Sequence, residues 1–280
     1  MSRVAGKVAL VTGAARGMGR SHAVRLAQEG ADIVAVDLCA DLDSTPYPGA
    51  NSQDLTSTTK LVEQTGRRIL ARRADTRNFK ELQDVVDEAI AEFGHIDVVC
   101  ANAGMSSFGF SWELSEESWQ EILDVNLTGS WKTVKAVIPH MIERNEGGSL
   151  VFISSTAGLI GVPTMSHYTA SKHGVVGLMR ALAVELAPHN IRVNSVNPGN
   201  VDTPMVNNAP MRKLFLPEVS DPTPEAANDV MREMSALPVG WLDSQGVSEA
   251  VLYLASDAAR HVTGITLPVD AGMSLPNKIR

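Results

Sequence analysis

Short apolar runs alternate with longer amphipathic stretches along most of the chain. The runs at 8–12, 33–37 and 150–154 are almost entirely apolar, which is typical of strands that are covered on both faces. In the stretch 79–93 the apolar positions recur every three or four residues and form one helical stripe. Strands are therefore expected at 8–12, 33–37, 69–74, 98–101, 150–154, 192–196 and 266–269. Helices are expected at 17–29, 56–65, 79–93, 116–143, 166–187 and 248–256.

The alternation of strands and helices predicts an α/β fold with a doubly wound parallel sheet and helices on both faces. No repeat interrupts it, so residues 1–280 are expected to form a single domain. Two segments depart from the pattern. Residues 41–54 form a loop of unusual length, and residues 203–239 are rich in proline, with a short helix expected around 226–234. Because ligands bind beyond the carboxyl ends of strands, the second segment is expected to be a substrate lid, with a plain surface loop as the alternative.

The charge balance disfavours nucleic acid and membrane surfaces as partners. The 280 residues include 24 Lys+Arg and 32 Asp+Glu, a net charge of −8, which attracts neither a phosphate backbone nor an anionic membrane. No signal peptide or sustained apolar span is recognisable, so we expect a cytoplasmic protein. Cys39 and Cys100 are too few for a disulfide scaffold. No cluster has metal-ligand spacing, so no metal is expected.

A glycine-rich turn, TGAARGMG at 12–19, lies between the first expected strand and the first expected helix. Its glycines allow a tight turn and let a pyrophosphate approach the N–H groups at the helix N-terminus. Asp37 ends the second strand, where a carboxylate would accept hydrogen bonds from the ribose hydroxyls of an adenosine and repel a 2′-phosphate. Arg16 could attract that phosphate, but its side chain is free to turn to solvent. NAD is therefore favoured over NADP as the cofactor.

Tyr168 and Lys172 lie four residues apart in the helix expected at 166–187. On a helix their side chains share one face, and a nearby ammonium would favour the phenolate. Such a pair could remove the proton from an alcohol while hydride leaves the carbon. Ser154 and Ser155 end the preceding strand, and because neighbours in a strand point to opposite faces, only one of them could face the phenol.

In their order and spacing these motifs resemble those of the short-chain dehydrogenase/reductase family, which has a Rossmann-type fold. The resemblance spans 7–272 and rests on TGAARGMG, ANAG at 101–104, Asn126, Ser155, YTASK at 168–172 and NPG at 197–199. It implies that Tyr168 is the acid/base and that Lys172 lowers its pKa and binds the nicotinamide ribose. It further implies that Ser155, in preference to Ser154, binds the substrate oxygen and that Asn126 holds a water relay from the lysine. A homotetramer is also implied.

The resemblance implies a set of NAD contacts as well. In related proteins Asp75 would meet the adenine amino group, Asn102 and Gly104 border the adenosine ribose, and Val201 and Thr203 hold the carboxamide and phosphates. Ala101 departs from the commoner Asn at that position, which removes one contact and changes nothing catalytic. The expected cofactor contacts, besides Tyr168 and Lys172, are Gly13, Arg16, Gly17, Met18, Gly19, Asp37, Leu38, Asp75, Asn102, Ala103, Gly104, Pro198, Gly199, Val201 and Thr203.

The loop at 41–54 follows Asp37 closely and resembles an insertion in the carveol dehydrogenase-like, mycofactocin-associated branch of the family. That resemblance implies NAD that stays bound and is reoxidised in place by a mycofactocin-type redox carrier derived from a peptide. A loop that leaves the chain beside the adenosine ribose could fold over it and slow its release. A surface insertion without such a role is the alternative.

The sequence therefore favours an NAD-dependent enzyme that interconverts a hydrophobic, terpenoid-like secondary alcohol and its ketone. Residues such as Met105, Phe110 and Trp112 could either line an apolar pocket for that substrate or seal the core, and His167 is expected at the rim. One alternative is a related enzyme for a 3-oxoacyl or steroid substrate with freely exchanging NAD. A non-catalytic nucleotide-sensing module is disfavoured because Ser155, Tyr168 and Lys172 occur together. A structural role is a further alternative, since the two long helices expected at 116–143 and 166–187 could build an oligomer interface, which is compatible with catalysis.

Overall fold

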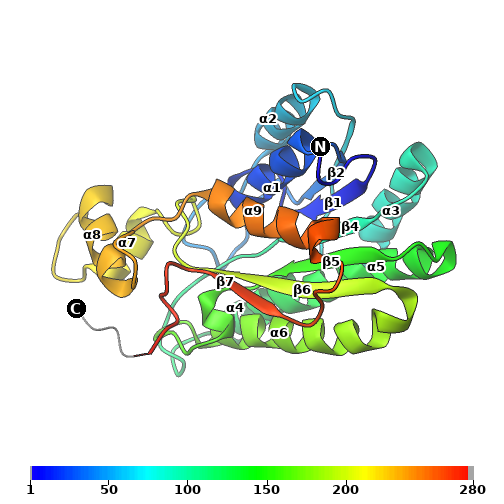
Figure 1. The fold of residues 1–280 in the computed structure, drawn as a ribbon. Coiled ribbons are helices and arrows are strands. Elements are labelled where there is room, and N and C mark those ends of the chain that lie inside the picture. Colours follow the sequence, from blue (N-terminus) through cyan, green and yellow to red (C-terminus); the bar gives the residue numbers. More distant parts are fainter. Residues whose placement is uncertain (1, 277–280) are drawn as a thin grey trace.

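The computed structural model describes residues 2–276 and consists of a parallel sheet with helices packed against both faces (Figure 1). Within these residues the sheet has seven strands in the order β3-β2-β1-β4-β5-β6-β7, each paired in parallel with its neighbours. The strands are β1 Val8–Thr12, β2 Asp32–Asp37, β3 Ile69–Arg73, β4 Val98–Ala101, β5 Gly148–Ile153, β6 Ile191–Pro198 and β7 Thr266–Val269. The predicted doubly wound α/β fold is confirmed.

The helices close a separate apolar core on each face of the sheet. Side chains of α1, α2 and α9 form one core with the strands, and side chains of α3, α5 and α6 form the other. Burial on both faces explains why the central strands are apolar along almost their whole length. The helices are α1 Gly17–Gln28, α2 Ser52–Glu63, α3 Phe79–Phe93, α4 Glu116–Leu123, α5 Gly129–Arg144, α6 Ser166–Leu186, α7 Ala209–Phe215, α8 Pro224–Met234 and α9 Ser244–Ala255.

Helix α2 begins at Ser52, four residues before the predicted start at 56. Asn51 and Asp54 form a reciprocal capping box: the Asn51 side chain accepts the Asp54 N–H at 3.1 Å, and the Asp54 carboxylate accepts the Asn51 N–H at 3.0 Å. Residues 52–54, which the sequence analysis included in the long loop, are thus the first turn of a helix. Helix α9 also begins earlier than predicted, because Asp243 caps it by accepting the Gly246 N–H at 2.7 Å.

The helix predicted at 116–143 is divided into α4 and α5 by a π-helical turn at Asp124–Thr128. Such turns are rare and often occur at functional sites, and Asn126 lies inside this one. The segment 203–239 contains α7 in addition to the expected short helix, which is α8. Helix α7 was not predicted, because it is short and proline lies in its first turn.

The strand order places a crevice between the carboxyl ends of β1 and β4, where the winding of the sheet reverses. The glycine-rich turn, Asp37, the ANAG motif and Ser155 all follow or end strands at this edge. Helices α7 and α8 stand out from the same end of the molecule (Figure 1). In the described range, no helix has the length and apolar character needed to cross a membrane.

Candidate active site

The glycine-rich turn packs tightly against the residues that follow β4. Gly13 has a φ of +65°, and a Cβ at this position would lie 2.9 Å from the Cα of Ala103. A Cβ on Gly19 would lie 2.0 Å from the carbonyl oxygen of Gly13. Backbone approach this close requires glycine. Among residues 2–276, no side chain accepts a hydrogen bond from the N-terminus of α1. Its first N–H groups therefore suit an anionic ligand group.

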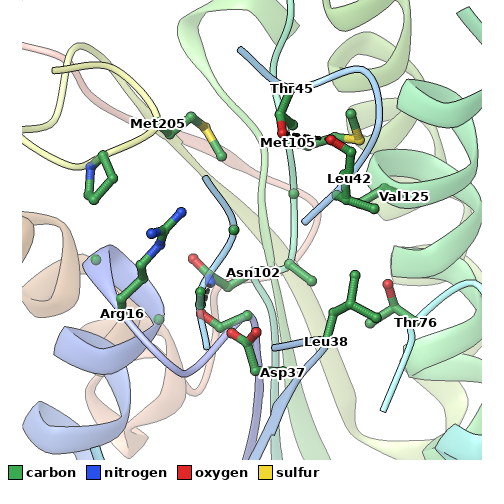
Figure 2. Close-up of a pocket in the computed structure, with 18 of the residues that line it drawn as sticks. Arg16, Asp37, Leu38, Leu42, Thr45, Thr76, Asn102, Met105, Val125 and Met205 are labelled. Carbon is green, nitrogen blue, oxygen red and sulfur yellow. Dashed lines mark hydrogen bonds between the residues drawn. The ribbon is translucent and has the colours of Figure 1, made fainter. Parts of the chain in front are cut away.

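A cleft runs past this turn along the carboxyl ends of β1, β2 and β4 (Figure 2). Asn102 lies in its wall, and its amide nitrogen donates to the carbonyl oxygens of Thr12 and Gly13 at 2.9 and 3.3 Å. The Asn102 Oδ1 is buried and has no protein partner, so a ligand hydroxyl could satisfy it. The expected cofactor contacts that line the cleft are Gly13, Arg16, Gly17, Met18, Gly19, Asp37, Leu38, Asp75, Asn102, Ala103, Gly104 and Thr203.

Asp37 and Arg16 have opposite predicted effects on the choice between NAD and NADP, and the structure holds their side chains in different ways. One carboxylate oxygen of Asp37 accepts the Ala15 N–H at 2.9 Å and the other accepts the Cys39 N–H at 2.9 Å. Each oxygen keeps acceptor capacity for a further hydroxyl. The Arg16 guanidinium instead donates to the carbonyl oxygen of Pro48. The cation that could attract a 2′-phosphate is therefore engaged by another part of the chain.

Asp75 also lines the cleft and is paired with a neighbouring cation. The Arg77 Nε lies 3.1 and 2.9 Å from the two Asp75 carboxylate oxygens, and Arg77 also contacts Glu121 at 3.2 Å. The Asp75 backbone N–H donates to Glu81 at 2.8 Å. The predicted contact with an adenine amino group would use a carboxylate whose position these bonds fix.

Ser155, Tyr168 and Lys172 meet where β5 ends and α6 begins. The Ser155 hydroxyl lies next to the Tyr168 phenol, close enough to lower the pKa of that phenol. The Lys172 Nζ lies 5.6 Å from the centroid of the Tyr168 ring and donates to the Ile153 carbonyl at 2.9 Å. Ser154 points the other way, and its hydroxyl donates to the Lys172 carbonyl at 3.0 Å. Of the two serines, Ser155 is the one that faces the phenol.

Burial governs the protonation of this group. It raises the pKa of Tyr168 to about 12, although the hydrogen bond from Ser155 lowers that pKa in part. It also lowers the pKa of Lys172 to about 8. The sequence predicts that Lys172 lowers the pKa of Tyr168. In this structure the net shift of that pKa is upward, because desolvation of the phenol disfavours its charged form. At pH 7 the Tyr168 phenol therefore holds its proton.

Asn126 is fully buried in the π-helical turn. Its Oδ1 accepts the Met105 N–H at 2.8 Å, and its Nδ2 donates to the Met105 carbonyl at 3.0 Å and to the Ser171 hydroxyl at 3.1 Å. Its own carbonyl accepts the Ser130 hydroxyl at 2.7 Å. The side chain thus fixes Met105 against α6. A water relay of the kind that the family resemblance implies would use the remaining lone pair of the Asn126 carbonyl.

Residues 41–51, here called the strap, close over the cleft and are attached on both of its sides. On one side the Pro48 carbonyl accepts from Arg16. On the other, Glu121 accepts the Ser44 N–H at 2.9 Å, and the Tyr47 hydroxyl accepts the Ser106 N–H at 3.2 Å. Leu42 packs against a small apolar cluster of Met105, Ile122 and Val125. The strap therefore spans the cleft between α1 and α4.

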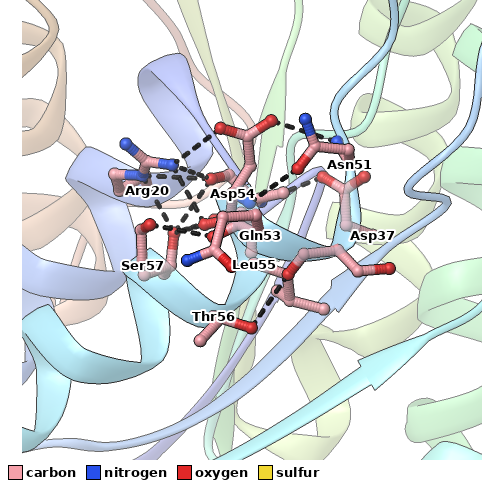
Figure 3. Close-up of polar contacts among 12 residues, drawn as sticks. Arg20, Asp37, Asn51, Gln53, Asp54, Leu55, Thr56 and Ser57 are labelled. Atoms are coloured by element: carbon pink, nitrogen blue, oxygen red, sulfur yellow. Dashed lines mark hydrogen bonds and ion pairs between the residues drawn. The ribbon is translucent and has the colours of Figure 1, made fainter.

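The end of the strap is anchored where α2 begins (Figure 3). The Arg20 Nη2 donates to the Asp54 carbonyl at 3.0 Å and lies 3.5 Å from the Asp54 carboxylate. The Thr58 hydroxyl donates to the carbonyl oxygens of Ala14 and Ala15, each at 3.0 Å. These bonds tie the first two turns of α2, which follow the strap directly, to the glycine-rich turn and to α1.

Other predicted residues lie beside the cleft or away from it. Pro198 ends β6, Gly199 and Val201 follow it, and none of these three residues lines the cleft. Asn197 donates to the Ser155 carbonyl at 3.0 Å, which joins the end of β6 to Ser155.

The positions of His167 and the neighbouring aromatic residues were less predictable. His167, expected at the rim, is fully buried, and its Nε2 lies 2.8 Å from the Ser107 hydroxyl. Met105 is buried and lines the cleft. Phe110 and Trp112 stack on each other with ring centroids 5.0 Å apart, are exposed, and are not part of the cleft wall.

No individual residue of the strap was predicted to have a role, yet Leu42 and Thr45 line the cleft (Figure 2). Tyr47 lines it as well. One signal was present in the sequence. Leu42 and Tyr47 are the only large apolar side chains in the polar stretch 41–54, and such residues in a loop need a surface to pack against.

Comparisons with known proteins agree with this geometry. A family model described as short chain dehydrogenase matches residues 7–213. The (−)-trans-carveol dehydrogenase of Rhodococcus erythropolis is 47% identical over 276 residues, which cover 98% of this chain and 100% of that protein. The structure of carveol dehydrogenase from Mycobacterium avium in complex with NAD aligns with a TM-score of 0.97 and 48% identity, covering 98% of this chain and 100% of that one. A short chain dehydrogenase from Mycobacterium paratuberculosis bound to NAD aligns with a TM-score of 0.89 and 43% identity, covering 97% and 99%.

The chain therefore belongs to the short-chain dehydrogenase/reductase family of oxidoreductases. Within that family it is closely similar to carveol dehydrogenases in sequence and in fold.

Proposed function

We propose that this protein is an NAD-dependent dehydrogenase that interconverts a hydrophobic secondary alcohol of the carveol type and its ketone. The Ser155 hydroxyl and the Lys172 ammonium, which both lie beside the Tyr168 phenol, carry this assignment. The cleft adjoins Lys172, because a Cβ on Gly104 of the cleft wall would lie 3.5 Å from the Lys172 Nζ. The similarity to carveol dehydrogenases supports the substrate class. Met105 and Met205 in the cleft wall offer adaptable apolar surface.

The cleft has the features that NAD requires. The uncapped N-terminus of α1 suits the pyrophosphate, and Asp37 suits the adenosine ribose hydroxyls. The unpartnered Oδ1 of Asn102 suits a further hydroxyl. Gly13, Gly17 and Gly19 leave the space in which the cofactor approaches the backbone.

When bound, NAD takes up the hydride from the alcohol carbon and, in its oxidised form, brings positive charge to the pocket. Tyr168 moves the proton: its phenolate accepts the hydroxyl proton in alcohol oxidation, and its phenol returns a proton to the ketone oxygen in reduction. Ser155 orients the substrate oxygen next to the phenol. Lys172 favours the phenolate and binds the nicotinamide ribose.

The strap holds NAD in the cleft between turnovers, and a mycofactocin-type carrier reoxidises it in place. The attachments of the strap to Arg16, Ser106 and Glu121 support this role, because all three must break before the cleft opens. Residues 203–239 act as the substrate lid, supported by the position of Thr203 and Met205 in the cleft wall. We further propose a homotetramer in the cytoplasm, where free thiols such as Cys39 and Cys100 persist.

The first test is the nucleotide content and acceptor requirement of the purified protein. Mass spectrometry of the heat-denatured protein is expected to detect NAD in near-stoichiometric amount. A panel of terpenoid secondary alcohols should turn over at least about tenfold faster with an artificial dye acceptor than with added NAD, because release of the nucleotide limits exchange. If the protein contained NAD but turned over as fast with added NAD as with the dye acceptor, the proposal that NAD stays bound between turnovers would be overturned. Activity confined to 3-oxoacyl or steroid substrates would overturn the substrate class.

The choice of NAD over NADP is expected to depend on the charge of Asp37. Asp37→Asn keeps the shape of the side chain and removes the repulsion of a 2′-phosphate, so the preference for NAD should fall at least about tenfold, or about 1.4 kcal/mol. Affinities for NADH and NADPH are measured by fluorescence titration of protein stripped of nucleotide. Asp41→Asn, a matched change in the strap, should leave the preference unaltered. If Asp37→Asn kept the wild-type preference for NADH over NADPH, residues other than Asp37 would have to distinguish the two nucleotides.

A further inference from the structure

Tyr47 is the point at which the strap reaches the catalytic centre. Its side chain lines the main cleft and also a smaller hollow that it shares with Thr203 and Pro204. It lies near enough to Tyr168 that a negative charge on the Tyr47 phenol would raise the pKa of Tyr168. Burial raises the pKa of Tyr47 itself, so its phenol stays neutral and its contacts persist over the physiological pH range.

The segment Met105–Ser107 receives Tyr47 and connects it to two catalytic elements. The Met105 backbone makes two hydrogen bonds with the Asn126 side chain, at 2.8 and 3.0 Å. The Ser106 N–H donates to the Tyr47 hydroxyl at 3.2 Å. The Ser107 hydroxyl lies 2.8 Å from the His167 Nε2. Three consecutive residues therefore join the π-helical turn, the strap and the first turn of α6.

This chain of contacts ends beside the proposed acid/base, because His167 directly precedes Tyr168 in α6. It is also dry: Ser106, Ser107 and His167 are 2%, 6% and 0% exposed. A buried polar group that loses its partner has no water to replace it, so breaking any one of these hydrogen bonds costs free energy. A displacement at one end is therefore expected to move the residues at the other end.

We propose that Tyr47 is a positioning residue that couples closure of the strap over the cofactor to the alignment of Tyr168, through Ser106, Ser107 and His167. The proposal rests on the proposed function and adds to it. The open strap would leave the Ser106 N–H without its partner and the Met105–Ser107 segment free to shift. The acid/base would then be aligned only when the cofactor is enclosed, which protects a reduced nucleotide from reacting in an open cleft.

The test is Tyr47→Phe, which removes the hydroxyl and keeps the ring. Because one neutral hydrogen bond is lost, NADH release, followed by its fluorescence, should accelerate by about threefold to tenfold. The value of kcat with a dye acceptor should fall by a similar factor, while KM for the alcohol and the thermal unfolding midpoint change little. Tyr253→Phe on α9, the same chemical change outside the cleft wall, is the matched control and should behave as wild type.

A double-mutant comparison and hydrogen exchange distinguish coupling between the strap and α6 from separate local effects at each of them. Ser107→Ala should lower kcat without changing how Tyr47 meets Ser106, and the double variant should lose less than the product of the two single losses. Hydrogen exchange should quicken in Tyr47→Phe both at 41–51 and at 166–170, a readout that needs no substrate. Faster NADH release or faster exchange in the strap alone, with kcat and α6 unchanged, would overturn the proposal. Failure of every alcohol to react with the wild type would overturn the proposed function instead, and the exchange data would still decide the coupling.

Discussion

Replacement of Tyr168 by phenylalanine is expected to lower kcat for alcohol oxidation by about a thousandfold while the protein keeps its fold and its nucleotide. The substitution removes only the phenol oxygen, which Ser155 contacts and which would otherwise carry the substrate proton. General acid–base catalysis by one positioned group contributes about a hundredfold to ten-thousandfold. The formation of bound NADH after mixing with alcohol, followed by its fluorescence in a single turnover, measures the loss directly.

Three further variants test whether the loss is specific to Tyr168. Tyr253→Phe should retain full activity, because Tyr253 lies on α9 and outside the cleft wall. Ser155→Ala should reduce the rate as well, whereas Ser154→Ala should affect stability more than rate, because the Ser154 hydroxyl donates to the Lys172 carbonyl at 3.0 Å and faces away from the phenol. A Tyr168→Phe variant that retains a tenth or more of the wild-type rate would refute the assignment of the acid/base.

The parts of the fold that the sequence predicted correctly are those that local patterns encode. The strands β1, β2 and β5 are buried on both faces, so their apolar runs mark them unambiguously. The glycine-rich turn was recognisable because neighbouring backbone leaves no room for a Cβ at Gly13 or Gly19, so both positions require glycine. Helix starts were less predictable, since Asn51 and Asp243 cap their helices with side chains that are equally common in loops.

The closure of the cleft could not be predicted residue by residue, because it depends on contacts between distant parts of the chain. Ser44 meets Glu121 across 77 residues, and Tyr47 meets Ser106 across 59. No spacing rule relates such pairs. The same limit applies to Tyr168 and His167. Lys172, one helical turn away, predicts a lowered pKa for Tyr168, and the position of His167 in the helix predicts a place at the rim, whereas the net pKa shift of Tyr168 and the position of His167 depend on tertiary burial.

The glycine-rich turn offers a second large effect. Gly19→Ala is expected to weaken NADH binding by about a hundredfold, or about 2.7 kcal/mol, and to lower the free energy of unfolding by about 1–3 kcal/mol. The added Cβ would lie 2.0 Å from the Gly13 carbonyl oxygen and 2.7 Å from the Asn102 amide nitrogen. Both belong to rigid parts of the cleft wall, so the N-terminus of α1 must move away from the position that suits the pyrophosphate. Nucleotide titration and thermal unfolding measure the two effects separately.

Gly177 provides the matched control, because it is also a helical glycine but a Cβ there would meet nothing within 4 Å. Alanine in a helix interior is intrinsically favoured over glycine by about 1 kcal/mol, so Gly177→Ala should raise the unfolding midpoint slightly and leave NADH affinity unchanged. The two substitutions are chemically identical and are predicted to shift stability in opposite directions. Only contact with the cleft wall distinguishes them, so equal effects on nucleotide affinity would mean that the turn does not hold the pyrophosphate.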